Sequence, residues 1–409
     1  MNIIIYGINF SPELVGVGKF TGELAFWLAK QGHSVHVICA PPYFPQWHVN
    51  SPYSNRFSLE IYDHISVQRC PIWIPSKPTG LLRLIHLASF AFTSFIPLLS
   101  KWRWKPDIII NMAPTIFTAP ASILFSKLLN RKCRTWLHIQ DFELDAAFEL
   151  GLLRGRWLRW LATKAERSLL RGFTTTSTIS LAMLHQLHSK GLNHKQTVLF
   201  PNWVDLNLIE AIPPCDSNTN IYRKQLEIPD EAIVLMYSGS MNKKQGLELI
   251  VEAIDLLNDI PNIIWLLAGE GPTKKELLVA TNHFNQVIHL PLQPHELMNE
   301  WLNAADIHLL PQRAGAADLV LPSKLLGMLA SGRPIVSTST KGSELETLTS
   351  KAGSCTTPGN AKEFAEALRQ LINEPKIRML AGKRARKLAE TLYDKVRVLE
   401  EFERQLKAH

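Results

Sequence analysis

The stretch from Ala304 to Thr338 constrains the fold of this chain more than any other. It contains a short apolar run, a loop, a helix that begins near Leu325 and is closed by Gly332, and a second apolar run. A strand, a helix and a second strand in quick succession predict a parallel β-α-β unit. The start of the helix, with Ser323 and Lys324 beside it, offers unpaired N–H groups and a positive dipole end. This arrangement suits an anion, although an ordinary capped crossover helix explains the spacing equally well.

The same alternation opens the chain. Residues 3–6 form a continuous apolar run, which is typical of a buried parallel strand. The next loop brings Gly16, Val17 and Gly18 to the start of a helix that ends before a second strand at 34–38. These glycines would let backbone N–H groups approach a phosphate or a sugar, or would merely allow a tight turn. The loop matches neither the dinucleotide fingerprint nor the Walker A pattern, which disfavours NAD and ATP.

The length of 409 residues is sufficient for two domains, each with its own core. Strands and helices alternate again from residue 233, after a stretch containing Pro and Asn at 212–220. We therefore predict an α/β protein with two doubly wound, Rossmann-like domains, at 1–205 and 206–375. Ligands would bind in a cleft between the carboxyl ends of the two sets of strands.

The charge is distributed unevenly between these halves. Residues 1–205 contain 21 Lys and Arg against 11 Asp and Glu, whereas the remainder is nearly balanced. A basic half usually faces nucleic acid, acidic phospholipid or a phosphorylated substrate. No nucleic-acid motif supports the first of these partners.

The cysteines indicate the compartment. The five are far apart and include no CxxC pair, which indicates reduced thiols in a cytosolic protein and no zinc site. The chain opens directly on a strand, so we expect no signal peptide.

Residues 41–79, rich in proline and aromatic residues, are predicted to form a long functional loop.

Two segments after this loop are candidates for membrane contact. The first, 80–106, has an uncharged core at 87–100 and cations at its ends; it is too short to span a bilayer but suits the membrane interface. A core helix of the first domain is the alternative. If exposed, its apolar anchors would each contribute about 1.5–3 kcal/mol on burial; they are Phe90, Phe92, Phe95 and Ile96.

A basic helix at 151–172 carries Trp157 and Trp160 and is the second such candidate. A solvated helix with two packed tryptophans explains this pattern equally well.

Candidate catalytic residues follow the strand predicted at 134–139. His138 and Asp141 lie at or just beyond its carboxyl end, where open α/β sheets place their chemistry, and Glu143 and Asp145 follow. A structural histidine remains the alternative.

In the second half, Gly239, Ser240 and Lys244 precede a helix at 247–257. This loop suits a phosphate, although a solvated strand-to-helix loop has the same composition.

Taken together, these residues resemble the retaining GT-B glycosyltransferases of family 4, in particular the colanic-acid and exopolysaccharide type. The resemblance covers nearly the whole chain and rests on SPELVGVGKFTGELAFWLAKQGHSV, LHIQDFELDA, PNWVD, YSGSMNKKQGLE, LAGEGP and GAADLVLPSKLLGMLASGRPIV. It implies an acceptor-binding first domain, a nucleotide-sugar-binding second domain, and a helical segment at 376–409 that packs back toward the first domain.

The resemblance also assigns roles by position. His138 and Asp141 would lie at the reacting sugar, and the backbone at Pro291 and Leu292 would contact the nucleobase of the donor. The remaining residues implied to bind the donor are Gly16, Val17, Gly18, Gly239, Ser240, Lys244, Arg313, Asp318, Ser323, Lys324 and Leu325.

The chain departs from the family pattern at the positions that would bind the diphosphate and the ribose of the donor. Ser240 and Gln245 stand where the family commonly has Arg and Lys, and Lys244 is displaced by one position. Of the usual pair of glutamates, the second falls at Gly327 and only Asp318 lies near the first. These changes indicate an altered donor site or a weakened enzyme, and the resemblance to the exopolysaccharide group favours the former.

The implied activity is metal-independent transfer of a hexose, preferably from UDP-glucose, to a lipid-linked saccharide during exopolysaccharide assembly. The enzyme would lie on the cytosolic face of the membrane and use no cofactor other than its donor substrate. A GDP-fucose donor, a nucleotide-sugar epimerase and a non-catalytic nucleotide-binding scaffold are the alternatives.

Overall fold

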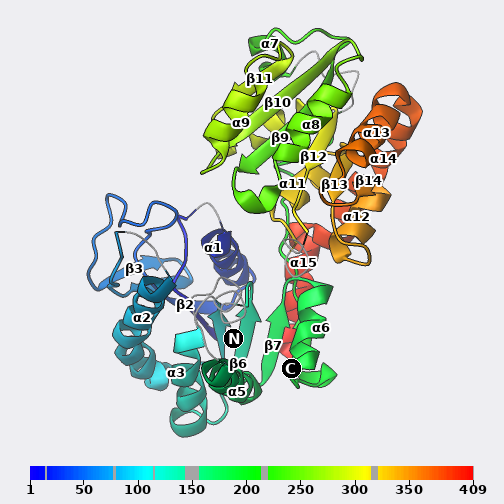
Figure 1. Ribbon diagram of the computed structural model, residues 1–409. Helices are drawn as coiled ribbons and strands as arrows, with labels where there is room; N and C mark the ends of the chain where they lie inside the picture. The colour runs from blue at the N-terminus through cyan, green and yellow to red at the C-terminus, as the bar shows by residue number, and fades with distance from the viewer. Residues whose placement is uncertain are drawn as a thin grey trace. The chain divides into compact units, whose positions relative to one another are not determined.

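The computed structural model describes residues 1–13, 16–76, 80–113, 116–142, 156–212, 220–314 and 321–408 (Figure 1). The chain forms two compact units, Met1–Pro201 with Leu399–His409, and Asn202–Val398. The first unit therefore ends a few residues before the predicted boundary at 205. Of the predicted terminal segment at 376–409, only Leu399–His409 belongs to the first unit.

An eight-stranded sheet forms the centre of the first unit, in the order β3-β4-β2-β1-β5-β6-β7-β8 along the described chain. All neighbours pair in parallel except β3 and β4, which are antiparallel. The strands are β1 (Asn2–Tyr6), β2 (Ser34–Cys39), β3 (Ser58–Tyr62), β4 (Ile65–Arg69), β5 (Ile108–Met112), β6 (Arg134–Ile139), β7 (Thr175–Thr178) and β8 (Thr197–Leu199).

The apolar runs place β1 at the middle of this sheet, as a buried parallel strand requires. Ile4 pairs with His36 of β2 on one side and with Ile109 of β5 on the other. The predicted strands at 3–6 and 34–38, and the helix between them, are confirmed. The helices of this unit are α1 (Gly16–Lys30), α2 (Gly80–Ser100), α3 (Ala119–Leu124), α5 (Arg156–Gly172), α6 (Leu181–Ser189) and the part of α15 (Lys395–Ala408) from Leu399 onward.

The helices α2 and α3 pack on one face of the sheet. Phe90 and Leu98 of α2 and Phe125, which follows α3, share one buried cluster with Ile4 and Ile109 of the strands. The helix α5 lies beside α3, because Gly172 is in close contact with Ile123. Between α1 and β2, His33 Nε2 lies 3.0 Å from Glu403 Oε1 of α15.

The prediction that residues 41–79 form one long loop is wrong in its second half, where β3 and β4 form a hairpin. In β4 the buried side chains alternate with partly exposed ones, and the strand extends the sheet in parallel beside β2. Two short alternating runs on either side of Asp63 and His64 carried this signal, which the surrounding prolines and aromatics obscured.

The helix α2 is longer than the uncharged run at 87–100 suggested. Together with the short η1 (Lys101–Trp104) it makes Leu82–Trp104 long and apolar enough to cross a membrane, by length and composition alone. One side packs on the sheet, where Phe90 and Leu98 are fully buried, while Phe92 is 83% exposed. The core-helix interpretation therefore holds for one face of α2 only.

The second unit has a six-stranded sheet, all parallel among the described residues, in the order β11-β10-β9-β12-β13-β14. The strands are β9 (Ile233–Ser240), β10 (Ile263–Glu270), β11 (Val287–Leu290), β12 (Ile307–Leu310), β13 (Ile335–Thr338) and β14 (Gly353–Thr356). The helices are α7 (Ile221–Gln225), α8 (Glu248–Leu256), α9 (Lys274–Thr281), α10 (Met298–Asn303), α11 (Lys324–Ala330), α12 (Glu344–Ala352), α13 (Ala361–Asn373) and α14 (Pro375–Leu388).

The strand β9 serves two cores because successive side chains point to opposite faces of a sheet. Leu235 and Tyr237 pack into the cluster that includes α8 and α13. Val234 and Met236 pack into the opposite cluster, with Trp301 of α10. Both faces of the sheet are therefore covered by helices, as a doubly wound domain requires. The helix α14 packs against α11 and α12 of this same unit.

The first unit is completed by the end of the chain. Phe402 of α15 stacks on Phe200, with ring centroids 4.0 Å apart, and meets the edge of Trp136 of β6 at 5.1 Å. Phe402 is 1% exposed, so late residues fill the core built by the first two hundred.

We predict that Phe402→Ala lowers the free energy of unfolding of the first unit by about 3–5 kcal/mol, because it leaves a cavity beneath two aromatic rings. Urea denaturation followed by Trp fluorescence would measure the change. Phe92→Ala is the matched control: its side chain is exposed, and the same truncation should cost no more than about 0.5 kcal/mol. Equal losses would contradict the assignment of Phe402 to the core.

Candidate functional site

The loop before α1 is shaped by a buried carboxylate. Glu13 accepts hydrogen bonds at Oε1 from the backbone N–H groups of Tyr43 and Phe44, both at 3.1 Å. Asn9 donates to its Oε2 at 2.9 Å. Burial raises the pKa of Glu13, while these hydrogen bonds and nearby Arg69 act in the opposite direction. Glu13 thus ties the loop before α1 to the loop after β2.

The three residues predicted at the start of α1 lie next to this carboxylate. Gly16 has a φ of +62°, in the left-handed region that favours glycine. Gly18 is buried, and a Cβ there would lie 2.4 Å from Glu13 Oε2. Val17 is partly exposed and its carbonyl accepts from Thr21 Oγ1 at 2.7 Å. Gly18 is therefore required by the packing of Glu13, and Gly16 by the backbone.

The second buried charge of this region is Arg69, which the sequence did not single out. Its guanidinium donates to Glu60 Oε1 at 2.6 Å and to the backbone carbonyls of Ala40 and Ser11, at 3.1 and 2.9 Å. It joins the ends of β2 and β4 to the loop that carries Glu13. Because two of its partners are backbone carbonyls distant in sequence, the sequence alone does not identify Arg69 and the folded pairing of β4 with β2 does.

His138 lies within β6 and is 1% exposed. Its Nδ1 is 2.9 Å from Ser177 Oγ, its Nε2 is 3.3 Å from Gln140 Nε2, and its ring lies 4.9 Å from that of Phe200. Burial lowers the pKa of His138 to about 3, so the imidazole is neutral near pH 7. Such a group can orient a ligand by hydrogen bonding, but it does not carry a charge.

Asp141 is exposed at the bend after β6. The structure therefore places the two predicted catalytic side chains in different environments, one buried and one open to solvent. Glu143 and Asp145, predicted in the same loop, lie outside the described residues.

In the second unit the carboxyl end of β9 is closely packed by glycines. Gly239 has a φ of +133°, and a Cβ there would lie 3.4 Å from Lys324 Cδ. A Cβ at Gly269 would lie 1.9 Å from the carbonyl oxygen of Gly239, and one at Gly271 would lie 2.1 Å from that of Met241. Residues 267–272 (LAGEGP) therefore support residues 239–242 (GSMN) through direct backbone contact.

Lys324 is the cation at the centre of this region. Its Nζ donates to Gln245 Oε1 at 2.7 Å and lies 4.2 Å from the ring centroid of Tyr237. The Tyr237 hydroxyl donates to the Ser240 carbonyl at 2.6 Å. Burial lowers the pKa of Lys324 to about 7. Gln245 stands where the family commonly has a lysine. Its side chain thus holds Lys324, from the start of α11, beside the loop at 239–246.

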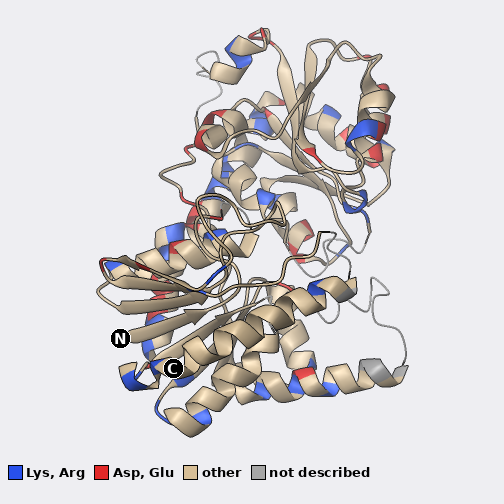
Figure 2. Ribbon diagram, turned by 90° about the vertical axis from the view of Figure 1, so that its left-hand side faces the viewer, with Lys and Arg blue, Asp and Glu red and all other residues tan. Residues whose placement is uncertain are grey.

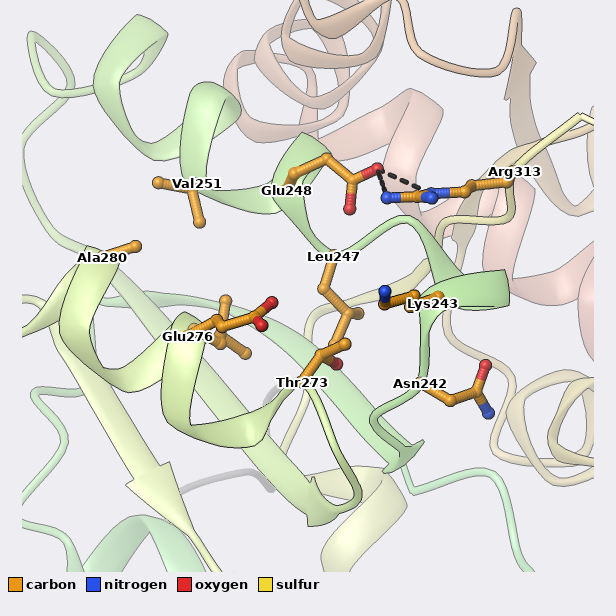
Figure 3. Close-up of a pocket in the computed structure, with 10 residues that line it drawn as sticks. Asn242, Lys243, Leu247, Glu248, Val251, Thr273, Glu276, Ala280 and Arg313 are labelled. Carbon is orange, nitrogen blue, oxygen red and sulfur yellow. Dashed lines mark hydrogen bonds and ion pairs between the residues drawn. The ribbon is translucent and has the colours of Figure 1, made fainter.

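Lys244 and Arg313 take part in other contacts near this loop. Lys244 is exposed in η6 (Lys243–Gln245), where its N–H donates to Asn242 and its carbonyl accepts from Arg313 N at 2.9 Å. Arg313 forms an ion pair with Glu248 of α8, at 2.8 Å. Figure 3 shows this pair at the rim of a small cavity, of about 180 Å³, that Lys243 and Glu276 also line.

The other predicted donor residues are dispersed. Pro291 and Leu292 are exposed after β11, and Ser323 is exposed before α11. The Leu325 N–H donates to the Pro322 carbonyl at 2.9 Å, so this predicted phosphate donor is already engaged in a turn. Asp318 lies outside the described residues.

The environment of Gly327 is apolar. A Cβ there would lie 3.1 Å from Leu302 Cδ1 and 3.9 Å from Ile209 Cδ1. A side chain at this position would thus leave the backbone toward two aliphatic residues.

Metal ligands do not gather in the part of the chain that the structure describes, where no three His, Cys, Asp or Glu side chains could hold one ion.

Solved structures share this architecture over the whole chain. Sucrose-phosphate synthase from Thermosynechococcus elongatus matches with a TM-score of 0.75 at 16% identity, over 100% of this chain and 99% of that one. Anabaena HepE in complex with UDP and glucose matches with a TM-score of 0.70, also at 16% identity, over 100% of both chains. The fold is that of the GT-B glycosyltransferases.

Sequence comparison gives the family. The model "Glycosyl transferase 4-like domain" matches residues 15–203, and "Glycosyl transferases group 1" matches residues 218–388. The chain is 41% identical to the colanic acid biosynthesis glycosyl transferase WcaI of Escherichia coli strain K12, over 98% of each chain. The protein belongs to the family-4 glycosyltransferases, as its motifs suggested.

Lys324 gives a testable pH dependence. Binding of a nucleoside diphosphate beside Lys324 favours the ammonium form, whereas burial favours the neutral amine above about pH 7. Binding would therefore take up a proton, and we expect the affinity for the nucleotide to fall by up to about tenfold per pH unit from pH 7 to 9. Titration calorimetry at several pH values would measure it.

Lys324→Arg is the control, because a guanidinium stays charged over this range and should remove that slope. The ionisation of the nucleotide is common to both proteins, so the difference between the profiles isolates Lys324. Identical profiles would show that Lys324 does not bind the nucleotide.

Proposed function

We propose that this glycosyltransferase transfers a hexose, with retention, from a UDP-sugar to a lipid-linked saccharide in exopolysaccharide assembly. The full-length identity of 41% to a colanic acid biosynthesis enzyme is the observation that carries this proposal. UDP-glucose is the preferred donor; HepE, which shares the fold, was solved with UDP and glucose.

The proposed chemistry needs a group that stabilises the departing nucleoside diphosphate. As the glycosidic bond to the donor breaks, negative charge develops on the diphosphate oxygens, and a pre-positioned cation lowers the barrier. Lys324, fixed by Gln245 and lying against Tyr237, is suited to this role without a metal ion. Donor binding would shift its equilibrium toward the charged form.

Proton transfer in this proposal does not require a protein base. In a retaining front-face reaction, the acceptor hydroxyl attacks on the side from which the diphosphate leaves, and a phosphate oxygen takes the hydroxyl proton. His138 is neutral, buried and hydrogen-bonded to Ser177, which suits positioning rather than proton transfer. The new glycosidic bond and the protonated diphosphate balance the reaction.

The location proposed for the enzyme is the cytosolic face of the cell membrane, as a peripheral protein. Support comes from the helix α2, in which Arg83 is the only Lys, Arg, Asp or Glu (Figure 2) and in which Phe92 and Ile96 are 83% and 74% exposed.

Nucleotide specificity is the first test of this function. A ligand at about 100 times its dissociation constant should add about 2.7 kcal/mol to stability. We expect UDP to raise the thermal unfolding temperature and GDP and NAD to leave it unchanged, measured by scanning calorimetry. A response to GDP alone would instead support a GDP-fucose donor, and a response to NAD alone an epimerase. No response to any of them would contradict a nucleotide-sugar site.

Turnover separates the enzyme from a nucleotide-binding scaffold, which the missing glutamates suggested. We expect Lys324→Met to slow UDP release from UDP-glucose in the presence of membranes by at least about a hundredfold, because the departing charge loses its cation. Lys243→Met is the matched control, since Lys243 is an exposed lysine of the adjacent loop, and should change the rate less than about threefold. Equal rates in both variants would contradict this role of Lys324, and no UDP release by the unaltered protein would favour the scaffold.

A further inference from the structure

A large pocket lies at the edge of the first sheet opposite to its carboxyl ends. It has a volume of about 580 Å³ and lies where β6 and β7 begin, between the end of α3 and the end of α5. The residues assigned above to the reacting sugar and the donor lie at or beyond the carboxyl ends of strands. This pocket is therefore separate from the transfer site.

The pocket is lined by cations. Its charged lining residues are Lys127, Arg131, Lys132 and Arg134, and no carboxylate lines it among the residues that the structure describes. Within the same ranges none of the four forms an ion pair. Thr174 and Gln196 add polar side chains. Four like charges around one concavity attract an anion, and phosphate oxygens can accept from several of them at once.

Exposed apolar side chains adjoin these cations on the same segment. The helix α3 continues into the short η3 (Phe125–Leu129). Here Leu124, Leu128 and Leu129 are 41%, 67% and 44% exposed. Lys127 and Arg131, which line the pocket, lie within a few residues of these leucines in the sequence, so cations of the pocket and exposed leucines belong to one segment.

The neighbouring helices extend this character. The helix α2 packs on the same face of the sheet as α3 and exposes Phe92, Ile96 and, in η1, Trp102. On α5, Trp157 and Trp160 are 73% and 50% exposed, and Lys164 Nζ lies 3.9 Å from the Trp160 ring centroid. Side chains that are exposed on helices covering one face of a sheet point away from that sheet. Tryptophan, leucine and flanking cations on such a face are typical of a membrane interface.

We propose that the pocket at Lys127, Arg131, Lys132 and Arg134 binds the phosphate of an anionic phospholipid headgroup in the bilayer. Leu128 and Leu129 enter the acyl boundary beside it, and α2 lies along the same surface. The inference rests on the membrane location in the proposed function but uses none of the donor-site residues. It assigns part of the membrane attachment to one pocket and one ligand.

Vesicle binding tests the proposal. Full-length protein is sedimented with vesicles of phosphatidylcholine, with or without 30% phosphatidylglycerol as an assumed, roughly bacterial anionic fraction. We expect Arg131→Gln with Lys132→Gln to weaken binding to the anionic vesicles by about 20–30-fold, since each surface cation contributes about fivefold. Both side chains are exposed, so the variant should fold, and its UDP-induced thermal shift should be unchanged.

The matched control is Lys341→Gln with Lys351→Gln, which removes the same charge from exposed positions of the second unit. It should change vesicle affinity less than about threefold. Equal losses in the two double variants would overturn the pocket, because only net charge would then matter. No loss in the Arg131 and Lys132 variant would also overturn it.

Two further measurements decide the source of the phosphate and the part played by the leucines. Leu128→Ser with Leu129→Ser should weaken binding to the anionic vesicles while leaving the UDP shift intact. The second measurement is thermal stability with inorganic phosphate. If phosphate stabilises the protein through Arg131 and Lys132 while their substitution leaves vesicle binding unaffected, the pocket binds a soluble anion and the lipid is rejected. Loss of the UDP shift alone would contradict the proposed function and leave this site standing.

Discussion

Parallel strand pairing is the constraint on which the other features of both units depend. A parallel strand needs a crossover to its neighbour, so helices cover both faces of the sheet and all carboxyl ends meet at one edge. β1 and β9 occupy equivalent inner positions; Glu13 lies in the loop after β1, and Gly239 lies at the carboxyl end of β9. The close backbone approach of Gly269 to Gly239 shows how little space this edge leaves, and why short loops there are rich in glycine.

The central elements were predictable because their sequence signal is local and strong. The apolar run at 3–6 predicted a buried parallel strand, and the alternation from residue 233 predicted a second series of strands and helices; the structure has both. The hairpin of β3 and β4 was not predicted, since an edge hairpin needs only weak alternation. The sequence of α2 left its burial open because the helix is apolar nearly all round, and the structure buries Phe90 and Leu98 while exposing Phe92.

The candidate site was less predictable, because its decisive contacts join residues distant in sequence. Gln245 and Lys324 are brought together by the pairing of β9 with β12, and neither shows this partnership in its local pattern. Arg313 was predicted to bind the donor, yet its ion pair with Glu248 depends on the position of α8 and does not show in the local sequence. His138 was correctly placed near the carboxyl end of β6, but its burial is set by Ser177 and Phe200 from other elements.

The helix α15 is shared between the units, with Lys395–Val398 in the second and Leu399–His409 in the first. During synthesis, the ribosome therefore produces nearly all of the second unit before Phe402, which the core of the first unit needs. The usual amino-terminal-first order of folding is reversed at the final step: the second unit can close while the first still exposes Trp136 and Phe200. Synthesis of Phe402 thus allows the core of the first unit to be completed, and a nascent chain stalled before this residue would lack the packing partner of Trp136 and Phe200.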